Sequence, residues 1–425
     1  MKINSNSIRK LIIIHLFLSF LFMLWWSVLK LPWYVTYIFD ILLCIEFAWV
    51  LMDIRPVLHK TGATPLIPIL IVFTFYLLLT QIFNFVSPLL SVMAFRRTFR
   101  FYLFFLACVV MLTKDGVRKI MKGLLWLQVV NFGLTIIQYM FLGYSQDNLG
   151  GIFGVEKGVN AYTNVYLCII SAYMLVRYLE KKTKLWPMLL TIVSALIIAV
   201  LAELKVFFVE IIVIVLLGIL LSNPSARTIK TIAFAGGGIV AAVALFGIIF
   251  PEHFEILLNM AMLAQYTTEK IHGYNISRLN AFSDINRLFF KNDPLLNLFG
   301  YGFGNCESGS VFYERYSDYH YSWFTHQVSF LEIGYVGIVL YMLFFVFIYV
   351  FSGKSKKQNP ENRLYYSFAQ IVSVMSMIWV FYDQSLRIEL AYIIFFALAV
   401  PLVVKKSGKK GCTLQSDRES NDACR

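Results

Sequence analysis

The feature that most constrains the fold is a series of apolar runs, each about as long as a helix that crosses a membrane. Such a helix needs about 20 predominantly apolar residues to span the hydrocarbon layer. Backbone polar groups cannot stay unpaired in lipid, so each run is predicted to be α-helical. We count twelve runs, at residues 11–29, 33–52, 66–86, 94–113, 120–142, 159–179, 185–202, 206–222, 229–250, 326–351, 364–382 and 388–404.

The composition agrees with an all-α polytopic membrane protein. Hydrophobic residues make up 59% of the 425 residues and charged residues only 14%, and the mean hydropathy is +0.71. A soluble domain carries about 25% charged residues. The first run is not a cleaved signal peptide, because its apolar stretch is too long, no small-residue cleavage site follows it and further runs come after it.

The positions of Lys and Arg predict the orientation, because short cytoplasmic loops carry an excess of these residues. If the N-terminus is cytoplasmic, the cytoplasmic segments hold 25 of the 37 Lys and Arg residues. Both termini are therefore predicted to be cytoplasmic. The net charge of +13 is then explained by orientation and by contact with anionic membrane lipid, not by a nucleic-acid partner. The cytoplasmic segments are 1–10, 53–65, 114–122, 177–184, 223–230, 352–363 and 405–425.

The chain divides at one long connection. Residues 1–250 are predicted to hold the first nine helices, and residues 324–404 the last three. Between them, residues 251–323 lie on the outer side, and they are too polar for lipid and too rich in aromatic residues for a linker. We predict that this external segment folds as a small helical cap. Residues 405–425 are predicted to be a solvated, unstructured cytoplasmic tail.

Three arginines lie at the outer end of the fourth run, although Lys and Arg usually gather on the cytoplasmic side. Ionisable groups at membrane depth cost roughly 2.5–3.5 kcal/mol each and usually face a cavity or a partner. Arg96 and Arg100 are four residues apart and share a helix face, whereas Arg97 points elsewhere. The pair indicates either a polar site or contact with lipid headgroups, and headgroup contact is favoured for Arg97.

Other charged residues near the outer ends favour local ion pairs. Glu203 and Lys205 lie in AELKVFF between two runs, and Asp383 and Arg387 are four residues apart at the last outer turn. A local pair is the simplest explanation for each, although a role in a polar site stays open. Two carboxylates lie deeper in the second run, where polar groups on neighbouring helices can pair with them: Asp40 and Glu46.

The cap segment contains an amphipathic helix that directs one arginine inward. At 100° per residue, Arg278 falls on the apolar stripe formed by Phe282, Ile285 and Phe289. A guanidinium on an apolar face needs an anionic partner, which is either a buried carboxylate or an anionic ligand. The wet face of the same helix holds Asn280, Asp284, Arg287 and Lys291.

A glycine-rich turn and a histidine follow this helix. The sequence NLFGYGFGN has neither P-loop spacing nor a following Lys-Ser/Thr, so a plain turn is favoured over a phosphate cradle. Thr325 is a plausible N-cap of the tenth helix, and His326 then lies at the mouth of that helix. Glu332 lies deeper, before two glycines that permit close packing. Neither the Cys spacing nor the loop residues Glu314, Asp318 and His320 predict a metal site.

These residues and motifs resemble the O-antigen ligase and polymerase family of bacterial surface-polysaccharide enzymes. The resemblance covers the many apolar runs, the late external segment, LFGYGFGN, and THQVSFLEIGYVG, where Gln327 replaces the usual Asn. GVNAYTN, which contains Asn164, resembles the family's Asn-containing helix start. AELKVFF resembles a position where many members carry a basic residue, here Lys205.

The resemblance implies a fold similar to C-type glycosyltransferases and transfer of a glycan from polyprenyl diphosphate. The reaction would occur at the outer face of the bacterial cytoplasmic membrane without a metal, cofactor or nucleotide sugar. It implies that Arg278 binds the diphosphate and that His326 orients or deprotonates the acceptor hydroxyl. The resemblance also implies chain-length regulators and flippases as protein partners. The residues expected to assist in substrate binding are Arg96, Arg100, Asn164, Lys205, Gln327 and Glu332.

Three functions are consistent with these features. A polymerase would join lipid-linked repeat units into surface polysaccharide, such as capsule, exopolysaccharide or O-antigen. A ligase would transfer finished glycan to a lipid or protein acceptor through the same reacting bond. A flippase for lipid-linked oligosaccharide is less favoured, because transporters commonly show internal repeats and charges along a central pathway.

Overall fold

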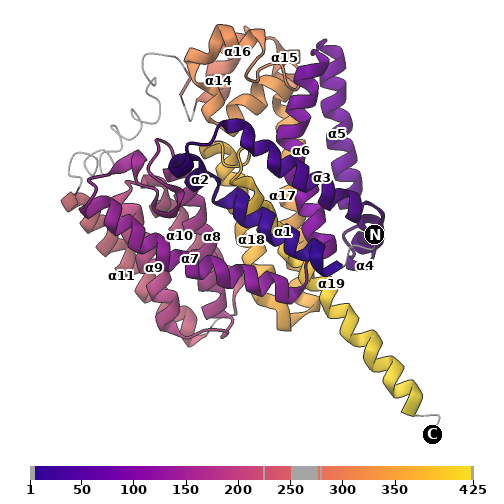
Figure 1. Ribbon diagram of the computed structural model, residues 1–425, viewed down its shortest axis with the longest axis vertical. Coiled ribbons are helices and arrows are strands. Elements are labelled where there is room, and N and C mark those ends of the chain that lie inside the picture. Colours follow the sequence, from indigo (N-terminus) through magenta and orange to yellow (C-terminus); the bar gives the residue numbers. More distant parts are fainter. Residues whose placement is uncertain (1–4, 224, 250–275, 278–279, 423–425) are drawn as a thin grey trace.

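A computed structural model describes residues 5–223, 225–249, 276–277 and 280–422, and within these ranges the chain is helical and contains no strand (Figure 1). Short 3-10 or π-helical turns connect several of the α-helices. The α-helices are α1 (Ser5–Phe20), α2 (Phe22–Leu29), α3 (Tyr37–Val50), α4 (Ile54–Thr61), α5 (Leu66–Phe83), α6 (Pro88–Met111), α7 (Lys114–Met140), α8 (Asn160–Leu179), α9 (Leu185–Leu201), α10 (Lys205–Leu221), α11 (Ala226–Ile249), α14 (Ala281–Ile285), α15 (Pro294–Phe299), α16 (Val311–Tyr316), α17 (Thr325–Gln358), α18 (Arg363–Tyr382) and α19 (Ala391–Asp422).

Each of the twelve apolar runs falls on a helix or a helix pair, so the prediction of an all-helical chain is confirmed for the described residues. Within the part of the chain that the structure describes, five helical stretches are long and apolar enough to cross a membrane, and a sixth is if α1 and α2, bent by 55°, form one span. The five are 34–61, 66–83, 114–140, 325–358 and 360–382. These helices are compatible with a polytopic membrane protein.

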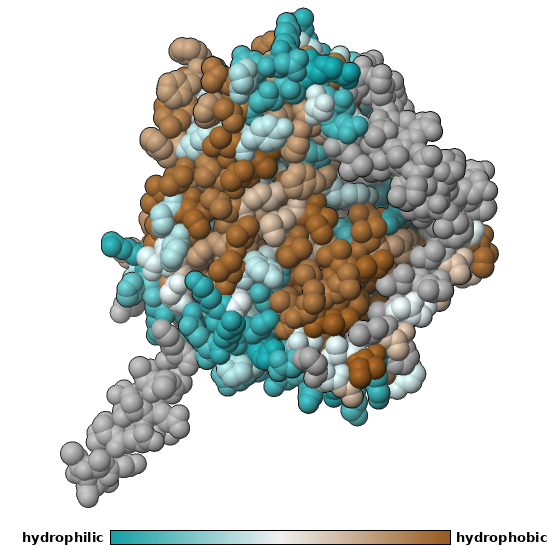
Figure 2. All heavy atoms as spheres, turned by 180° about the vertical axis from the view of Figure 1, so that it is seen from behind, coloured by the Kyte–Doolittle hydropathy of each residue, from teal (hydrophilic) through white to brown (hydrophobic). Residues whose placement is uncertain are grey.

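The outer surface of the bundle supports the same conclusion. Figure 2 shows apolar residues across the middle of the visible face and hydrophilic residues toward both ends. Large apolar side chains are exposed along several helices, including Ile71 and Phe75 on α5 and Leu216 and Leu220 on α10. A soluble monomer rarely exposes so much contiguous apolar surface, whereas lipid removes the cost of doing so.

The core of the bundle is formed by α8, α18 and the first half of α19, whose side chains are buried on almost all sides. A helix that is apolar all round belongs inside a larger assembly of helices. α17 packs along α18 and α5, while α6 packs along α19 and α3, and α10 packs along α8. This arrangement brings the ends of helices from both halves of the sequence together.

The basic connections predicted to lie on one side of a membrane do share one end of the bundle. Side chains in these connections hydrogen-bond to one another or to the helix ends beside them, at the opposite end of α17 from Thr325. The contacts include Arg9 Nε to the Met111 carbonyl (2.9 Å), Lys114 Nζ to Asn362 Oδ1 (2.6 Å), Arg227 Nη1 to the Thr183 carbonyl (2.9 Å), Arg363 Nη2 to Asn223 Oδ1 (2.9 Å) and Lys406 Nζ to the Leu112 carbonyl (2.9 Å).

The other end of α17 carries the cap, which here means residues 276–277 and 280–323 (Figure 1). The cap residues gather around an apolar cluster, while 251–275 and 278–279 lie outside the described residues. Residues of α17 complete that cluster and fix the cap on the bundle. The buried members are Ile276, Ala281, Ile285, Phe289, Phe290, Cys306 and Tyr321 from the cap, with Val328, Phe330, Leu331 and Ile338 from α17.

The C-terminal segment differs from the prediction of an unstructured tail. α19 continues to Asp422 as one helix, and its last part projects away from the bundle (Figure 1). Extending an existing helix adds one hydrogen bond per residue without a new nucleation cost. The polar composition that predicted disorder therefore does not prevent the helix from continuing.

Candidate functional site

α17 is interrupted nine residues after its start, and the interruption shapes the site. Gly334 has φ +58° and ψ −165°, which breaks the helix within residues 325–358. This combination of angles is essentially restricted to glycine. A broken helix leaves carbonyls without their usual partners, and here three find donors elsewhere: Leu331 accepts from the Tyr301 N–H (2.7 Å), Glu332 from the Gly302 N–H (2.9 Å) and Ile333 from the Tyr76 hydroxyl (2.6 Å).

The glycine-rich segment 300–304 is the turn that docks onto this interruption. Gly300 has φ +71°, and a Cβ there would lie 2.4 Å from the carbonyl carbon of Glu332. The backbone of the turn therefore approaches α17 more closely than a side chain allows. Because the N–H groups of Tyr301 and Gly302 are bonded to α17 carbonyls, they are not available to cradle a phosphate. The prediction of a plain turn is confirmed.

His326 lies in the first turn of α17 and is buried, with 2% of its surface exposed. Its ring lies near those of Phe282 in the cap and Phe381 in α18, with centroid distances of 5.8 and 5.6 Å. Thr325, predicted as the N-cap, is instead the first helical residue. Its hydroxyl (2.8 Å) and N–H (2.9 Å) both donate to the carbonyl of Asp383, which follows α18. The hydroxyl thus joins two helix ends instead of capping its own helix.

The cap contacts α17 directly beside His326. Gln327, also buried, donates from Nε2 to the carbonyl of Ser277 at 3.4 Å. Ser277 precedes Arg278 in the chain, and Arg278 itself lies outside the described residues. Two predicted features of the cap helix are confirmed: Ile285 and Phe289 are buried, and the Arg287 side chain is 67% exposed. Asp284, predicted on the wet face, is only 18% exposed, and it accepts a hydrogen bond from the Ser277 N–H at 3.0 Å.

Glu332 is buried on the cap side of α17. Its Oε1 accepts a hydrogen bond from the backbone N–H of Cys306 at 3.1 Å. Burial, together with the carboxylates of Glu332 and Glu307, raises the pKa of the Cys306 thiol well above its usual range. Cys306 is therefore a structural thiol and not a nucleophile.

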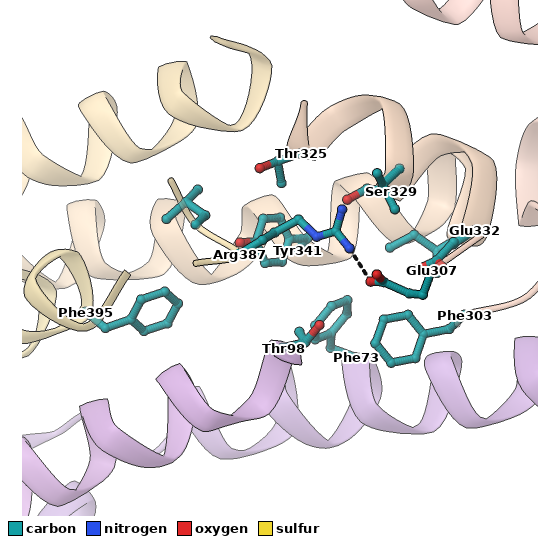
Figure 3. A pocket seen from close by; sticks show the side chains of 13 residues that line it. Phe73, Thr98, Phe303, Glu307, Thr325, Ser329, Glu332, Tyr341, Arg387 and Phe395 are labelled. Atoms are coloured by element: carbon teal, nitrogen blue, oxygen red, sulfur yellow. Dashed lines mark hydrogen bonds and ion pairs between the residues drawn. The ribbon is translucent and has the colours of Figure 1, made fainter. Parts of the chain in front are cut away.

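A cavity beside Glu332 contains an ion-pair cluster (Figure 3). Its empty space, open solvent included, is about 500 Å³. Arg97 of α6 binds one carboxylate oxygen of Glu307 in the cap, and Arg387 binds the other. Burial lowers the pKa of Arg387, but Glu307 and Glu332 offset this effect and raise it overall. Two predictions are therefore wrong: Arg97 does not face lipid headgroups, and Arg387 pairs with Glu307 instead of Asp383.

The two arginines predicted to form a substrate-binding pair are held by different carboxylates. Arg96 contacts Asp40 of α3, with Nη2 2.6 Å from Oδ2. Arg100, of which only 6% of the side chain is exposed, contacts Glu389 at 3.1 Å. Arg96 lies in the first half of α6 and Arg100 at its middle, and Arg100 also donates to the backbone carbonyl of Arg387 at 3.5 Å. Arg100 therefore lies next to the cluster, whereas Arg96 faces α3.

A second buried carboxylate lies among α8, α10 and α18. Glu210 accepts hydrogen bonds from Asn164 Nδ2 (2.8 Å), Cys168 Sγ (3.1 Å) and Trp379 Nε1 (2.8 Å). Asp383, whose carbonyl binds Thr325, also interacts electrostatically with Glu210. Asn164 is thus held inside the bundle by the buried carboxylate of Glu210.

The local ion pair predicted for Glu203 and Lys205 is confirmed, with 3.0 Å between Lys205 Nζ and Glu203 Oε1. The predicted pairing of the two carboxylates in the second run is also confirmed. Asp40 binds Arg96 as described, and Glu46 binds His15 of α1 at 3.1 Å, with both side chains fully buried. The Asp40–Arg96 and Glu46–His15 pairs join α1, α3 and α6, and none of these four residues lines the cavity.

The structure thus brings His326, Gln327 and Glu332 to one end of the bundle beneath the cap. Sequence reasoning did not single out Glu307 or Glu210, and it assigned Arg387 to a local pair. For Glu210 the available signal was its position, an acidic residue within an apolar run that is costly to bury. For Glu307 no signal was available, because it lies in a polar loop where a carboxylate is ordinary.

Among the residues that the structure describes, no group of three or more His, Cys, Asp or Glu side chains is arranged to hold a metal ion. In comparisons with known proteins, the sequence matches no protein-family model and no curated protein.

Proposed function

We propose that this protein is a metal-independent glycosyltransferase that polymerises glycan repeat units carried by polyprenyl diphosphate. In this proposal it spans the bacterial cytoplasmic membrane twelve times, both termini are cytoplasmic, and the cap lies on the outer face. Its fold would be similar to that of the C-type glycosyltransferases. The proposal rests on the sequence motifs and on the polar groups gathered beneath the cap.

The observation that carries the proposal is the contact between Ser277 and Gln327. It joins the residue before Arg278 to the residue after His326, the two positions that the family resemblance assigns to catalysis. Arg278 and His326 are 48 positions apart in the sequence. The contact attaches the cap to the first turn of α17 beside His326.

The proposed reaction needs one nucleophile and one leaving group. The acceptor hydroxyl oxygen attacks the anomeric carbon of the donor glycan, the bond from that carbon to the diphosphate oxygen breaks, and the hydroxyl proton passes to His326. For this transfer the hydroxyl must lie about 3 Å from the imidazole. Arg278 binds the departing diphosphate through charge-assisted hydrogen bonds of about 1.5–3 kcal/mol each.

Only contacts that strengthen as negative charge develops on the diphosphate accelerate the reaction. Arg100 and Lys205 would add positive charge at the same end of the bundle, and Arg96 would do so from the α3 side. Asn164, Gln327 and Glu332 would bind sugar hydroxyls.

The test replaces Arg278 and His326 separately by Ala and measures the length of the surface glycan. We expect His326→Ala to slow chain growth by about 10²–10⁴-fold, as for loss of a general base. The control is Arg287→Ala, which removes an exposed arginine of the same cap segment and should leave glycan length unchanged. Full-length glycan from both well-expressed site variants would refute the assignment.

The same system separates the related functions. A deletion strain that displays single repeats has lost a polymerase, whereas one that accumulates lipid-linked polymer has lost a ligase. Elongation of lipid-linked glycan by purified protein in detergent, where there is no membrane to cross, excludes a flippase.

A further inference from the structure

One segment of the cap runs inward along the hairpin that α5 and α6 form. The carbonyl of Phe303 accepts a hydrogen bond from Gln81 Nε2 at 2.9 Å, within the last turn of α5. An added Cβ at Gly304 would lie 3.1 Å from the Cβ of Ala94, six residues after α6 begins. At 1.5 Å per residue, that contact is about 9 Å below the start of α6. The segment therefore lies beside the hairpin and not above its tip.

The hairpin itself has the character of a surface in lipid up to its tip, residues 84–87. No charged residue occurs between Lys60 and Arg96. α5 is 18 residues long, which is about 27 Å and close to the 30 Å of the hydrocarbon layer. Its cap-side end therefore lies near the boundary of that layer. Large apolar side chains are exposed along α5, over the tip and into α6: Ile71, Val72, Phe75, Leu78, Ile82, Phe83, Phe85, Leu89 and Val92.

The cap segment meets the condition for non-helical backbone at this depth. Lipid offers no hydrogen bonds, so irregular backbone is tolerated there only where protein covers it and pairs its polar groups. Residues 302–304, 306 and 307 are buried. The N–H groups of Gly302 and Cys306 donate to the carbonyl and the carboxylate of Glu332 at 2.9 and 3.1 Å. The segment is thus enclosed and hydrogen-bonded by the bundle.

α15 forms the outward-facing side of this part of the cap. One side of α15 packs on α17, where the backbone of Leu298 lies against Gly334. Its other side is apolar and exposed, with 64% of Leu295, 42% of Leu298 and 43% of Phe299 accessible. Such an apolar cluster is unfavourable in water, whereas acyl chains can cover it without cost.

We propose that α15 and residues 300–307 are embedded in the membrane leaflet on the cap side, and that the exposed face of α15 contacts acyl chains. The covering molecule is lipid, because the turn after α15 packs on Asn84 and Val86 of the hairpin tip. The apolar face of α15 therefore adjoins the lipid-facing surface of α5. The Arg97–Glu307–Arg387 cluster then lies below the membrane surface, where the low dielectric strengthens its ion pairs.

The test measures how fast a charged, water-soluble maleimide labels introduced cysteines in the full-length protein in phosphatidylcholine nanodiscs. Peptide mass spectrometry assigns each label to its site, so the native cysteines do not interfere. We expect Leu295→Cys and Phe299→Cys to react at least about tenfold more slowly than Arg287→Cys, because the reactive thiolate does not form in hydrocarbon. Arg287 is the matched control, since its side chain is 67% exposed on the same cap and its charge keeps it in water.

A second measurement identifies the molecule that covers α15. The photoreactive residue p-benzoylphenylalanine is placed at position 299 and irradiated in the same nanodiscs, and we expect an adduct with the mass of one phosphatidylcholine. Equal labelling rates for the three cysteine variants, or a cross-linked dimer in place of the lipid adduct, would overturn the proposal. If a cysteine variant does not fold, the cross-link decides: a lipid adduct supports the embedded cap and its absence refutes it. Neither measurement depends on glycan transfer.

Discussion

Replacing Gly334 by Ala tests the interruption of α17 on which the site geometry depends. Gly334 has φ +58° and ψ −165°, and an added Cβ would lie 2.4 Å from both the carbonyl carbon and the carbonyl oxygen of Leu298. Leu298 belongs to α15, so the overlap is between two backbones and cannot be relieved by turning a side chain.

The cost has two parts. Holding Ala at these angles costs about 1–3 kcal/mol, and forcing one methyl group into a packed contact costs about 1–3 kcal/mol more. We therefore expect Gly334→Ala to lower the free energy of unfolding by about 2–6 kcal/mol. That is a large part of the 5–15 kcal/mol typical of folded proteins.

The assay is thermal unfolding of the purified protein in detergent, followed by tryptophan fluorescence. The control is Gly143→Ala, because Gly143 has φ +70° and nothing lies within 4 Å of its added Cβ. The control retains the conformational cost of about 1–2 kcal/mol but has no overlap. If both variants melt at the same temperature, α15 does not lie against the interruption and the close approach is wrong.

Two further predictions concern buried polar groups. Cys306 should resist maleimide at about pH 8, near the ordinary thiol pKa, in the folded protein and react once the protein is unfolded in denaturant; labelling of Cys306 in the folded protein would contradict its burial. Glu389→Ala leaves the Arg100 guanidinium buried without its carboxylate and should cost about 3–5 kcal/mol in the same melting assay. Asp115→Ala, which breaks the exposed pair with Arg118, should cost less than about 1 kcal/mol, and equal effects would show that the Arg100 pair is not buried.

The helices and the cap were predictable because their signals are local. Apolar runs of about 20 residues specify helices whatever surrounds them, and the inward face of the cap helix follows from the 100° repeat of Ile285 and Phe289. The tail was the exception. Its polar composition resembles disordered segments, but α19 extends through it to Asp422.

The partners of the charged residues were not predictable to the same degree. Residues close in sequence, such as Glu203 and Lys205, were paired correctly. Arg387 was assigned to Asp383 because they are four residues apart, yet it binds Glu307, which is 80 residues away. Charge interactions depend on distance in space and not on distance along the chain. Arg387 therefore pairs with the carboxylate that the fold brings next to it in a low-dielectric environment, and not with the one nearest in sequence.

The sequence by itself determined which segments are helical, which end of the bundle carries the basic connections, and which stretch forms the cap. Each of these follows from the chemistry of consecutive residues in lipid or water. Only the tertiary structure decided how α17 breaks at Gly334, how the glycine turn pairs with the freed carbonyls, and which carboxylate lies between Arg97 and Arg387. Those features depend on backbones and charges from distant segments meeting in space, because hydrogen-bond donors and counter-ions must be supplied wherever packing has left a polar group without water.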